Sequence, residues 1–236
     1  MDAEEKLAII ESFKRFFKET VVANHVPNTE KCSKLSAFQV NPFLAKYLAN
    51  YLTGNGDSIS IAKALIYPRI LGTSPTTSFG SNFQKFISVG LGAYGSGISG
   101  IDIEFIDQID GRRKYCQLKA GPQTINADDV PTISNHFNEL KNRARTNNLS
   151  IELSDMIVGI LYSSSGSLSH NYRALEREYP IFVGRDFWHH LTGDIRFYDD
   201  LISAIGEAAV EADGSKLLQQ TIEALAKDIE QNGHLF

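Results

Sequence analysis

The segment from Ile101 to Lys119 constrains the fold of this chain more than any other. Its first part, "IDIEFI", alternates apolar and acidic residues, which is typical of a β-strand with one buried face. An Asp-Gly pair follows in "QIDGRR" and predicts a hairpin turn, so "KYCQLK" is the expected return strand. Because residues two apart on a strand share a face, we expect the hairpin to bring Asp102 and Glu104 alongside Gln117 and Lys119.

The rest of the chain predicts an α/β protein with a mixed sheet. "DMIVGILY" is a continuous apolar run, typical of a strand buried on both faces, and "YPIFVG" is a second such strand. The spacing of apolar residues predicts helices over residues 3–23, 42–52, 128–147 and 215–231, and further helices in "DFWHHL" and "FYDDLISAIGEAAVEA". "GTSPTTSFGSNFQKFI" is expected to form a loop and then a helix from about Thr77. We expect a single domain over residues 1–236, with an N-terminal helical segment over 1–70, a core over about 77–162 and C-terminal helices over 195–236.

Composition argues against several classes of protein. Hydrophobic residues make up 42% of the chain, yet no apolar run is long enough to cross a bilayer, and the N-terminus lacks the basic-then-apolar pattern of a leader peptide. Cys32 and Cys116 are too few for a disulfide framework or a zinc site, so a cytoplasmic location is expected. The net charge of −5 argues against a protein that coats nucleic acid over its whole surface, but a nucleic-acid enzyme needs positive charge only in its cleft.

Three other patterns are poor candidates for a site. The glycines of "VGLGAYGSGISG" precede a strand, whereas a phosphate-binding loop needs the order strand, glycines, helix. His189 and His190 in "FWHHLTGD" are adjacent on an expected helix and point about 100° apart, so they cannot easily ligate one metal. "YSSSGSLSH" follows a buried strand but has no paired base for a serine hydrolase, so we interpret it as a loop that could touch a ligand.

The charged side chains of the hairpin favour a metal-dependent reaction. Two carboxylates close together repel each other, and their burial would raise a pKa unless a cation neutralises them. Mg²⁺ does so, because it prefers carboxylate, carbonyl and water oxygens. Lys119 could then stabilise the charge of a pentavalent phosphate or help to orient or deprotonate a water. A surface hairpin with solvated charges is the alternative that these residues alone leave open.

Asp102 on one strand and Lys119, two residues after Gln117, on the next strand resemble the motif of the PD-(D/E)xK nuclease superfamily. The expected order of helices and strands over residues 77–162 also matches that fold. Four stretches resemble, more narrowly, one group of type II restriction endonucleases: "TSFGSNFQKFI", "SGIDIEF", "QLKAGPQTINADDV" and "FWHHLTGD…FYDDLISAIGEAA". The "LKAGPQTIN" block is the most specific of them, and Ile101 replaces the proline of the superfamily pattern. The resemblance implies a restriction-endonuclease-like core with additional terminal helices, Mg²⁺ as cofactor, Asp102 as a metal ligand and Lys119 as the catalytic lysine.

Gln117 departs from the superfamily pattern, which usually has Asp or Glu at this position. A neutral amide can offer one oxygen to a metal but no charge. Glu104 could supply the missing charge, Gln117 could ligate as a neutral oxygen, or an acid of the following helix could reach back, namely Asp128, Asp129 or Glu139. We favour the first two together. The expected metal ligands are then Asp102, Glu104 and Gln117, and the catalytic residues are these three with Lys119.

The resemblance also implies double-stranded DNA as substrate, read as a palindrome by a homodimer, with a cognate DNA methyltransferase in the same system. Clustered cations are candidates for phosphate contacts, and the loops expected over residues 74–82 and 163–173 are candidates for base readout. The candidate DNA-binding residues are Arg112, Arg113, Lys114, Lys141, Arg143, Arg145, Arg173 and Asn82. The C-terminal amphipathic helices could form the dimer interface or pack within the chain.

The expected function is therefore site-specific hydrolysis of DNA. A structure-specific repair nuclease of the same fold is one alternative. A DNA-binding module whose nuclease site has decayed is another, and Gln117 would fit it. The presence of both Asp102 and Lys119 favours an active enzyme, because a decayed site has no reason to keep that pair.

Overall fold

The computed structural model of the protein describes residues 2–91 and 94–232. Within them the chain forms two compact units, each built from separate stretches of sequence. The first unit contains residues 2–14 and 80–206 and includes the β-sheet, and the second contains residues 15–79 and 207–232 and is helical. The expectation of a single domain stays a prediction.

The first unit is built on a five-stranded mixed sheet in the order β1-β2-β3-β4-β5, as expected for an α/β protein. β2 pairs antiparallel with β1 and β3, and β3, β4 and β5 are parallel. The strands are β1 (Tyr94–Gly95), β2 (Ile103–Ile106), β3 (Arg113–Lys119), β4 (Met156–Ile160) and β5 (Ile181–Val183). Every residue of β4 is buried, which confirms the strand predicted from its continuous apolar run.

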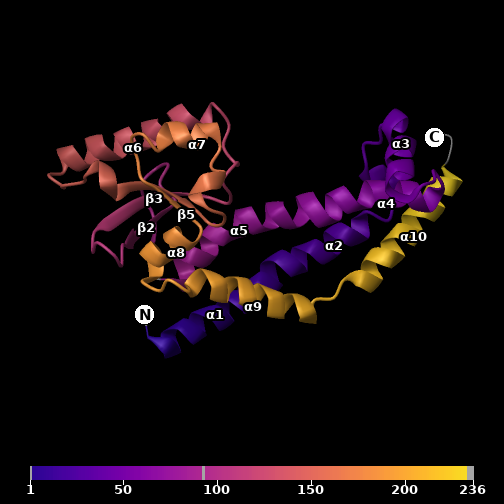
Figure 1. Ribbon diagram of the computed structural model, residues 1–236, viewed down its shortest axis with the longest axis horizontal. Helices are drawn as coiled ribbons and strands as arrows, with labels where there is room; N and C mark the ends of the chain where they lie inside the picture. The colour runs from indigo at the N-terminus through magenta and orange to yellow at the C-terminus, as the bar shows by residue number, and fades with distance from the viewer. Residues whose placement is uncertain (1, 92–93, 233–236) are drawn as a thin grey trace. The chain divides into compact units, whose positions relative to one another are not determined.

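Helices cover both faces of this sheet (Figure 1). α6 (Asp129–Thr146) and α7 (His170–Leu175) lie on one face, where Phe137 and Tyr172 pack in a core cluster with Val158 of β4. α8 (Arg185–Thr192) lies on the other face, against Gly159 and Cys116. A Cβ at position 159 would lie 2.5 Å from the Phe187 ring, so a glycine is needed for α8 to pack this closely.

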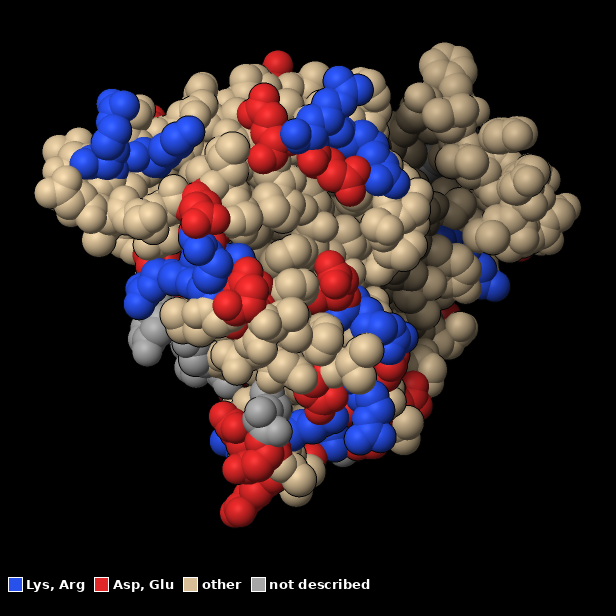
Figure 2. Space-filling model, turned by 60° about the vertical axis from the view of Figure 1, so that its left-hand side comes forward, with Lys and Arg blue, Asp and Glu red and all other residues tan. Residues whose placement is uncertain are grey.

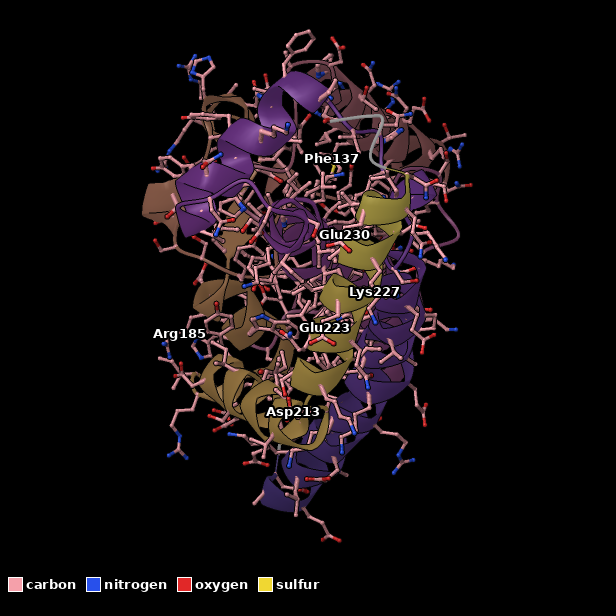
Figure 3. The ribbon with its side chains drawn as sticks, turned by 90° about the vertical axis from the view of Figure 1, so that its right-hand side faces the viewer. Phe137, Arg185, Asp213, Glu223, Lys227 and Glu230 are labelled. Carbon is pink, nitrogen blue, oxygen red and sulfur yellow. The ribbon has the colours of Figure 1, made fainter. Side chains whose placement is uncertain are left out.

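The second unit is a bundle whose core joins helices from both ends of the chain. α3 (Pro42–Thr53) and α4 (Ser58–Tyr67) pack with α10 (Ser215–Gln231), and α2 (Ala23–Lys31) adds to the same cluster. Ile222, Leu225 and Ile229 of α10 are buried there, so its apolar face packs within the chain. Glu223, Lys227 and Glu230 lie on the exposed side of α10 (Figure 3).

Three further helices, α1 (Ala3–Phe17), α5 (Ser74–Gly90) and α9 (Phe197–Glu211), contribute residues to both units. The helix expected over residues 3–23 is confirmed, and helical structure continues through α2. The helix expected over 42–52 is α3, which ends as predicted because Gly54 adopts a left-handed conformation with φ 80°. None of the helices in the described residues is long and apolar enough to span a membrane.

The loop expected over residues 74–82 is wrong, because these residues form the first turns of α5, whereas the helix expected from about Thr77 is present and begins at Ser74. The Ser/Thr-rich sequence suggested a loop, since hydroxyl side chains compete for backbone hydrogen bonds. Here the hydroxyls of Thr76 and Thr77 donate to the carbonyl oxygens four residues earlier, at 2.7 and 2.9 Å, and the helix is maintained. The glycine-rich segment before β2 includes Gly92 and Ala93, which lie outside the described residues.

Candidate active site

Asp102 lies directly before β2, where its side chain joins the hydrogen bonding of the sheet. Its main-chain nitrogen donates to the carbonyl oxygen of Cys116 at 3.0 Å, so the chain is already paired with β3 at this point. Asp102 Oδ2 then accepts a hydrogen bond from the main-chain nitrogen of Leu118 at 2.7 Å. This bond fixes the orientation of the carboxylate relative to both strands.

Burial raises the pKa of Asp102 above its ordinary value. The hydrogen bond from the Leu118 amide and the positive charge of Lys119 act in the opposite direction but do not cancel the effect of burial. The interactions that the protein makes with the ionised carboxylate therefore offset only part of the free-energy cost of burying its charge. A bound cation would provide the remaining compensation.

Gln117 lies beside Asp102 on the same face of the sheet. Ile103 pairs with Cys116, so the preceding residue, Asp102, stands opposite Gln117. The side chain of Gln117 is buried, and its Nε2 lies 3.4 Å from the carbonyl oxygen of Ile133 and 3.4 Å from His136 Nδ1, both on α6. The amide nitrogen of Gln117 points toward α6. The amide oxygen is therefore the atom that could ligate a cation near Asp102.

Lys119 completes this group at the end of β3. It lies two residues after Gln117 on the same face, and its positive charge acts to lower the pKa of Asp102. The structure therefore brings Asp102, Gln117 and Lys119 together, as the pattern of the two strands predicted.

Glu104, the expected second carboxylate, is on the same face but has other partners. It pairs opposite Tyr115, further along the hairpin from Lys119. Its Oε1 accepts a hydrogen bond from Ser96 Oγ at 2.8 Å, and its Oε2 lies 3.2 Å from a guanidinium nitrogen of Arg113. Glu104 would have to leave both partners before it could ligate a metal beside Asp102.

The acids of α6 do not converge on Asp102 either. Asp129 accepts a hydrogen bond from the main-chain nitrogen of Asn126 at 2.8 Å, and Asp128 and Glu139 are exposed. In the part of the chain that the structure describes, no three His, Cys, Asp or Glu side chains form a metal-binding group. Mg²⁺ does not require one, because it is commonly held by one or two carboxylates with water and phosphate oxygens.

The cations of the hairpin are engaged with carboxylates. Lys114 is only 1% exposed, and its ammonium group donates to Asp110 at 2.5 Å and lies within 3.8 Å of Asp107 and Asp155. Arg112 donates to both oxygens of Asp155 and thereby holds the pKa of that carboxyl below its usual range. A buried ammonium group cannot reach a phosphate, so Lys114 is not retained among the candidate DNA contacts.

The other candidate DNA contacts are spread over the unit. Lys141, Arg143 and Arg145 are exposed on the second half of α6. At about 1.5 Å per residue, Arg145 lies about 14 Å along the helix axis from His136, so this cluster would meet DNA at a distance from the scissile bond. Arg173 pairs with Glu176 at 2.7 Å, and Asn82 is part of α5. Figure 2 shows acidic and basic side chains interspersed on this side of the molecule, without one continuous basic surface.

Two aromatic residues that the sequence analysis missed shape the loop after Lys119. The Tyr172 hydroxyl donates to the carbonyl oxygen of Gly121 at 3.1 Å and lies 3.0 Å from Thr124 Oγ1. Tyr162 packs directly over Gly121, where a Cβ would lie 2.4 Å from its hydroxyl oxygen. A side chain at the glycine of the "LKAGPQTIN" block would therefore displace the Tyr162 ring.

His136 is the third missed residue, although a signal for it was present. Ile133, Phe137 and Leu140 form the buried stripe of α6, and His136 falls on the same side at helical spacing. His136 is a polar residue on the core side of the helix that follows the strand of Lys119. This pattern was sufficient to select it from the sequence as a candidate site residue.

Two comparisons with known proteins bear on this site. The family model described as "Type II restriction endonuclease EcoO109I" matches residues 11–213, a range that contains all of the residues discussed above. A search of curated proteins found no match.

Proposed function

The chain belongs to the family of the type II restriction endonuclease EcoO109I, and from this premise we propose that it is a site-specific endonuclease that hydrolyses double-stranded DNA with the help of Mg²⁺. The observation that carries the proposal is the carboxylate of Asp102, fixed by the Leu118 amide and placed beside Gln117 and Lys119. The mixed sheet with helices on both faces is compatible with a PD-(D/E)xK core, to which we assign it.

The residues at this point fit a Mg²⁺ ion. Asp102 offers a carboxylate whose pKa is raised by burial, and Gln117 offers a neutral amide oxygen, both of which are hard ligands. We propose these two as the protein ligands, with water and phosphate oxygens as the others. Glu104 would join them only after release from Arg113 and Ser96. The chemistry that a bound Mg²⁺ supplies is polarisation of the scissile phosphate and a lower pKa of the attacking water.

The protein's own groups orient the reaction and stabilise its charge. The main-chain nitrogen of Leu118 holds Asp102 in one orientation, so little reorganisation is needed when the substrate arrives. Lys119 presents an ammonium group beside Asp102, where it would donate to an oxygen of the phosphate as negative charge develops. Because that charge is largest in the transition state, Lys119 contributes more to the rate than to substrate binding.

We further propose that the enzyme acts as a homodimer, because cutting both strands of a palindrome calls for one active site per strand. α3 offers a surface for a second copy. Its alanines, Ala45 and Ala49, face the core, whereas its large apolar side chains face outward. The outward side chains, with exposures from 44% to 90%, are Phe43, Leu44, Tyr47, Leu48, Tyr51 and Leu52. Only one charged residue, Lys46, interrupts this helix, so a second copy of the surface would bring few like charges to the interface.

The proposal is tested by digesting a long DNA of mixed sequence with the purified protein, in Mg²⁺ and in EDTA. Discrete fragments that require Mg²⁺ are expected, and sequencing of their ends would give a palindromic site. A smear of products would instead indicate a nuclease directed by DNA structure or lacking specificity. Intact DNA that is nevertheless retarded in a gel would indicate a binding module without nuclease activity, and the proposal would be wrong.

The cellular setting follows from the same proposal. A restriction endonuclease acts on intracellular DNA, so we place the protein in the cytoplasm with a cognate methyltransferase that protects the host sequence. This partner would act on the same DNA site and need not bind the protein. DNA methylated at the cleavage site is therefore expected to resist digestion.

A further inference from the structure

His136 is packed against the turn that delivers Asp102 to the active site. Gly100, two residues before Asp102, has a left-handed conformation with φ 79°. A Cβ at this glycine would lie 2.1 to 2.5 Å from three atoms of the His136 ring. The imidazole therefore lies directly over the backbone of the turn, and a glycine is needed there both for the conformation and for the close approach.

The same ring also contacts Gln117. His136 Nδ1 lies 3.4 Å from Gln117 Nε2. One side chain of α6 thus contacts the turn before Asp102 and the amide of Gln117. Its neighbours Ile133 and Phe137 anchor this part of α6 in the core.

We infer that His136 is a positioning residue for the cation site: by accepting a hydrogen bond from the Gln117 amide, it directs the amide oxygen toward the cation beside Asp102. This inference rests on the proposed function, because it assigns a partner to the proposed ligand Gln117. It identifies a residue that acts through the ligand and not on the substrate.

The chemistry of the amide explains why such a residue is needed. A carboxylate can ligate a metal through either of its oxygens, whereas an amide ligates only through its single oxygen and fails if it turns over. An acceptor beside the amide nitrogen removes that ambiguity. The tautomer of His136 that carries its proton on Nε2 offers this acceptor at Nδ1, and the carbonyl oxygen of Ile133 offers a second one. Both acceptors belong to α6, so Gln117 is oriented by one rigid element.

The test uses His136→Asn and His136→Leu. The asparagine oxygen can occupy the position of Nδ1 and accept the same hydrogen bond, whereas leucine fills space without an acceptor. The readout without DNA is the rise in unfolding temperature on adding Mn²⁺ alone, and the readout with DNA is the Mg²⁺ concentration that gives the half-maximal cleavage rate. Loss of a partner that orients a metal ligand typically weakens metal affinity about 10- to 100-fold. We expect a loss of this size for leucine and a much smaller one for asparagine.

Two controls separate this role from general packing. Asn138→Leu changes an exposed residue of the same helix and should leave both readouts unchanged. In the double variant with Gln117→Ala, His136→Leu should weaken Mn²⁺ binding no further, because a residue that acts through Gln117 has no effect in its absence. Unfolding temperatures measured without metal report the purely structural cost of each substitution.

The possible outcomes are distinct. Additive losses in the double variant, equal losses for asparagine and leucine, or no Mn²⁺ effect on the wild-type protein would each overturn the inference. If the wild type cleaves DNA in Mg²⁺ but the His136 variants match it in both readouts, the inference fails while the proposed function stands. If the wild type does not cleave DNA, the proposed function itself fails.

Discussion

At the scale of single residues, the site depends on a carboxylate that the fold holds in an unfavourable environment. Burial raises the pKa of Asp102, so the folded protein binds a proton at this group more tightly than the unfolded chain does. Ionised Asp102 therefore costs stability at neutral pH. As the pH falls below the folded-state pKa this cost decreases, and it is gone once the pH is below the ordinary pKa of Asp in the unfolded chain.

Asp102→Asn tests this cost and the catalytic role together. The variant should lose Mg²⁺-dependent cleavage, because it lacks the charged ligand, and yet unfold at a higher temperature than the wild type at neutral pH. The asparagine oxygen can still accept the hydrogen bond from Leu118. The difference in unfolding temperature should shrink as the pH is lowered toward about 4, the ordinary pKa of Asp. A variant that is less stable than the wild type at neutral pH would contradict this.

Gln117→Glu adds the charge that the superfamily pattern usually has at this position. Without metal, two adjacent carboxylates should repel each other and lower the unfolding temperature. With Mg²⁺, the additional charge should lower the metal concentration that gives the half-maximal cleavage rate. Titration of Mg²⁺ in cleavage assays checks this, and an unchanged titration curve together with unchanged stability would place Gln117 away from the cation.

The two-residue repeat of side-chain direction in a β-strand was sufficient to predict that Asp102, Gln117 and Lys119 share a face of the sheet. This placement depends only on local sequence, namely the alternation in "IDIEFI" and "KYCQLK" and the Asp-Gly turn between them. The same pattern could not show that Arg113 and Ser96 engage Glu104, because this depends on which charged neighbour packs against it. His136 was missed because its role requires the helix to pack on the sheet in a particular register, which strand periodicity does not contain.

At the scale of elements, the β2–β3 hairpin is stabilised by a charged network and not by its turn alone. Lys114 and Arg112 were expected at the hairpin as DNA contacts, and in the structure both bind carboxylates: Arg112 binds Asp155, and Lys114 binds Asp110 and lies near Asp155. The sequence placed the cations correctly but could not reveal their partners, since Asp155 is distant in the chain. Buried Lys114 faces three carboxylates that need its charge.

Lys114→Met should therefore act on stability and not on DNA binding. Removing one partner from a buried ionic network costs about 3–5 kcal/mol, because it leaves buried charge without compensation. Lys141→Met, at an exposed position on α6, should change stability by less than about 0.5 kcal/mol. Urea unfolding of the two variants measures the contrast, and equal stabilities would show that Lys114 is not needed by the hairpin.

At the scale of the whole molecule, the pattern of apolar residues indicates where a second copy would bind. The C-terminal helix α10 was expected either at the dimer interface or in the core, and its apolar residues are in the core of the helical unit. α3 has the reverse pattern, with alanines inside and large apolar residues outside. Periodicity identified α3 as a helix but could not tell which of its two apolar sides faced the core.

Tyr51→Asp tests the proposed dimer surface, since Tyr51 is 81% exposed on α3. A charge in the middle of an apolar interface should convert the dimer to a monomer, as measured by sedimentation at several protein concentrations. Val210→Asp is the matched control, because Val210 is equally exposed on α9. A wild-type protein that is monomeric at all concentrations, or a Tyr51 variant that stays dimeric, would contradict the assignment.

The central claim is that Asp102, Gln117 and Lys119 form a working nuclease site although one acidic ligand is replaced by an amide. The most direct test is the cleavage rate of Lys119→Met relative to the wild type at saturating Mg²⁺ and saturating enzyme, with Lys141→Met as the control and DNA binding measured separately. Loss of a group that stabilises transition-state charge should slow cleavage by on the order of 10²–10³-fold while the protein still binds DNA. A Lys119→Met variant that cleaves as fast as the Lys141 control would contradict the claim, because the hydrolysis would then occur at another site.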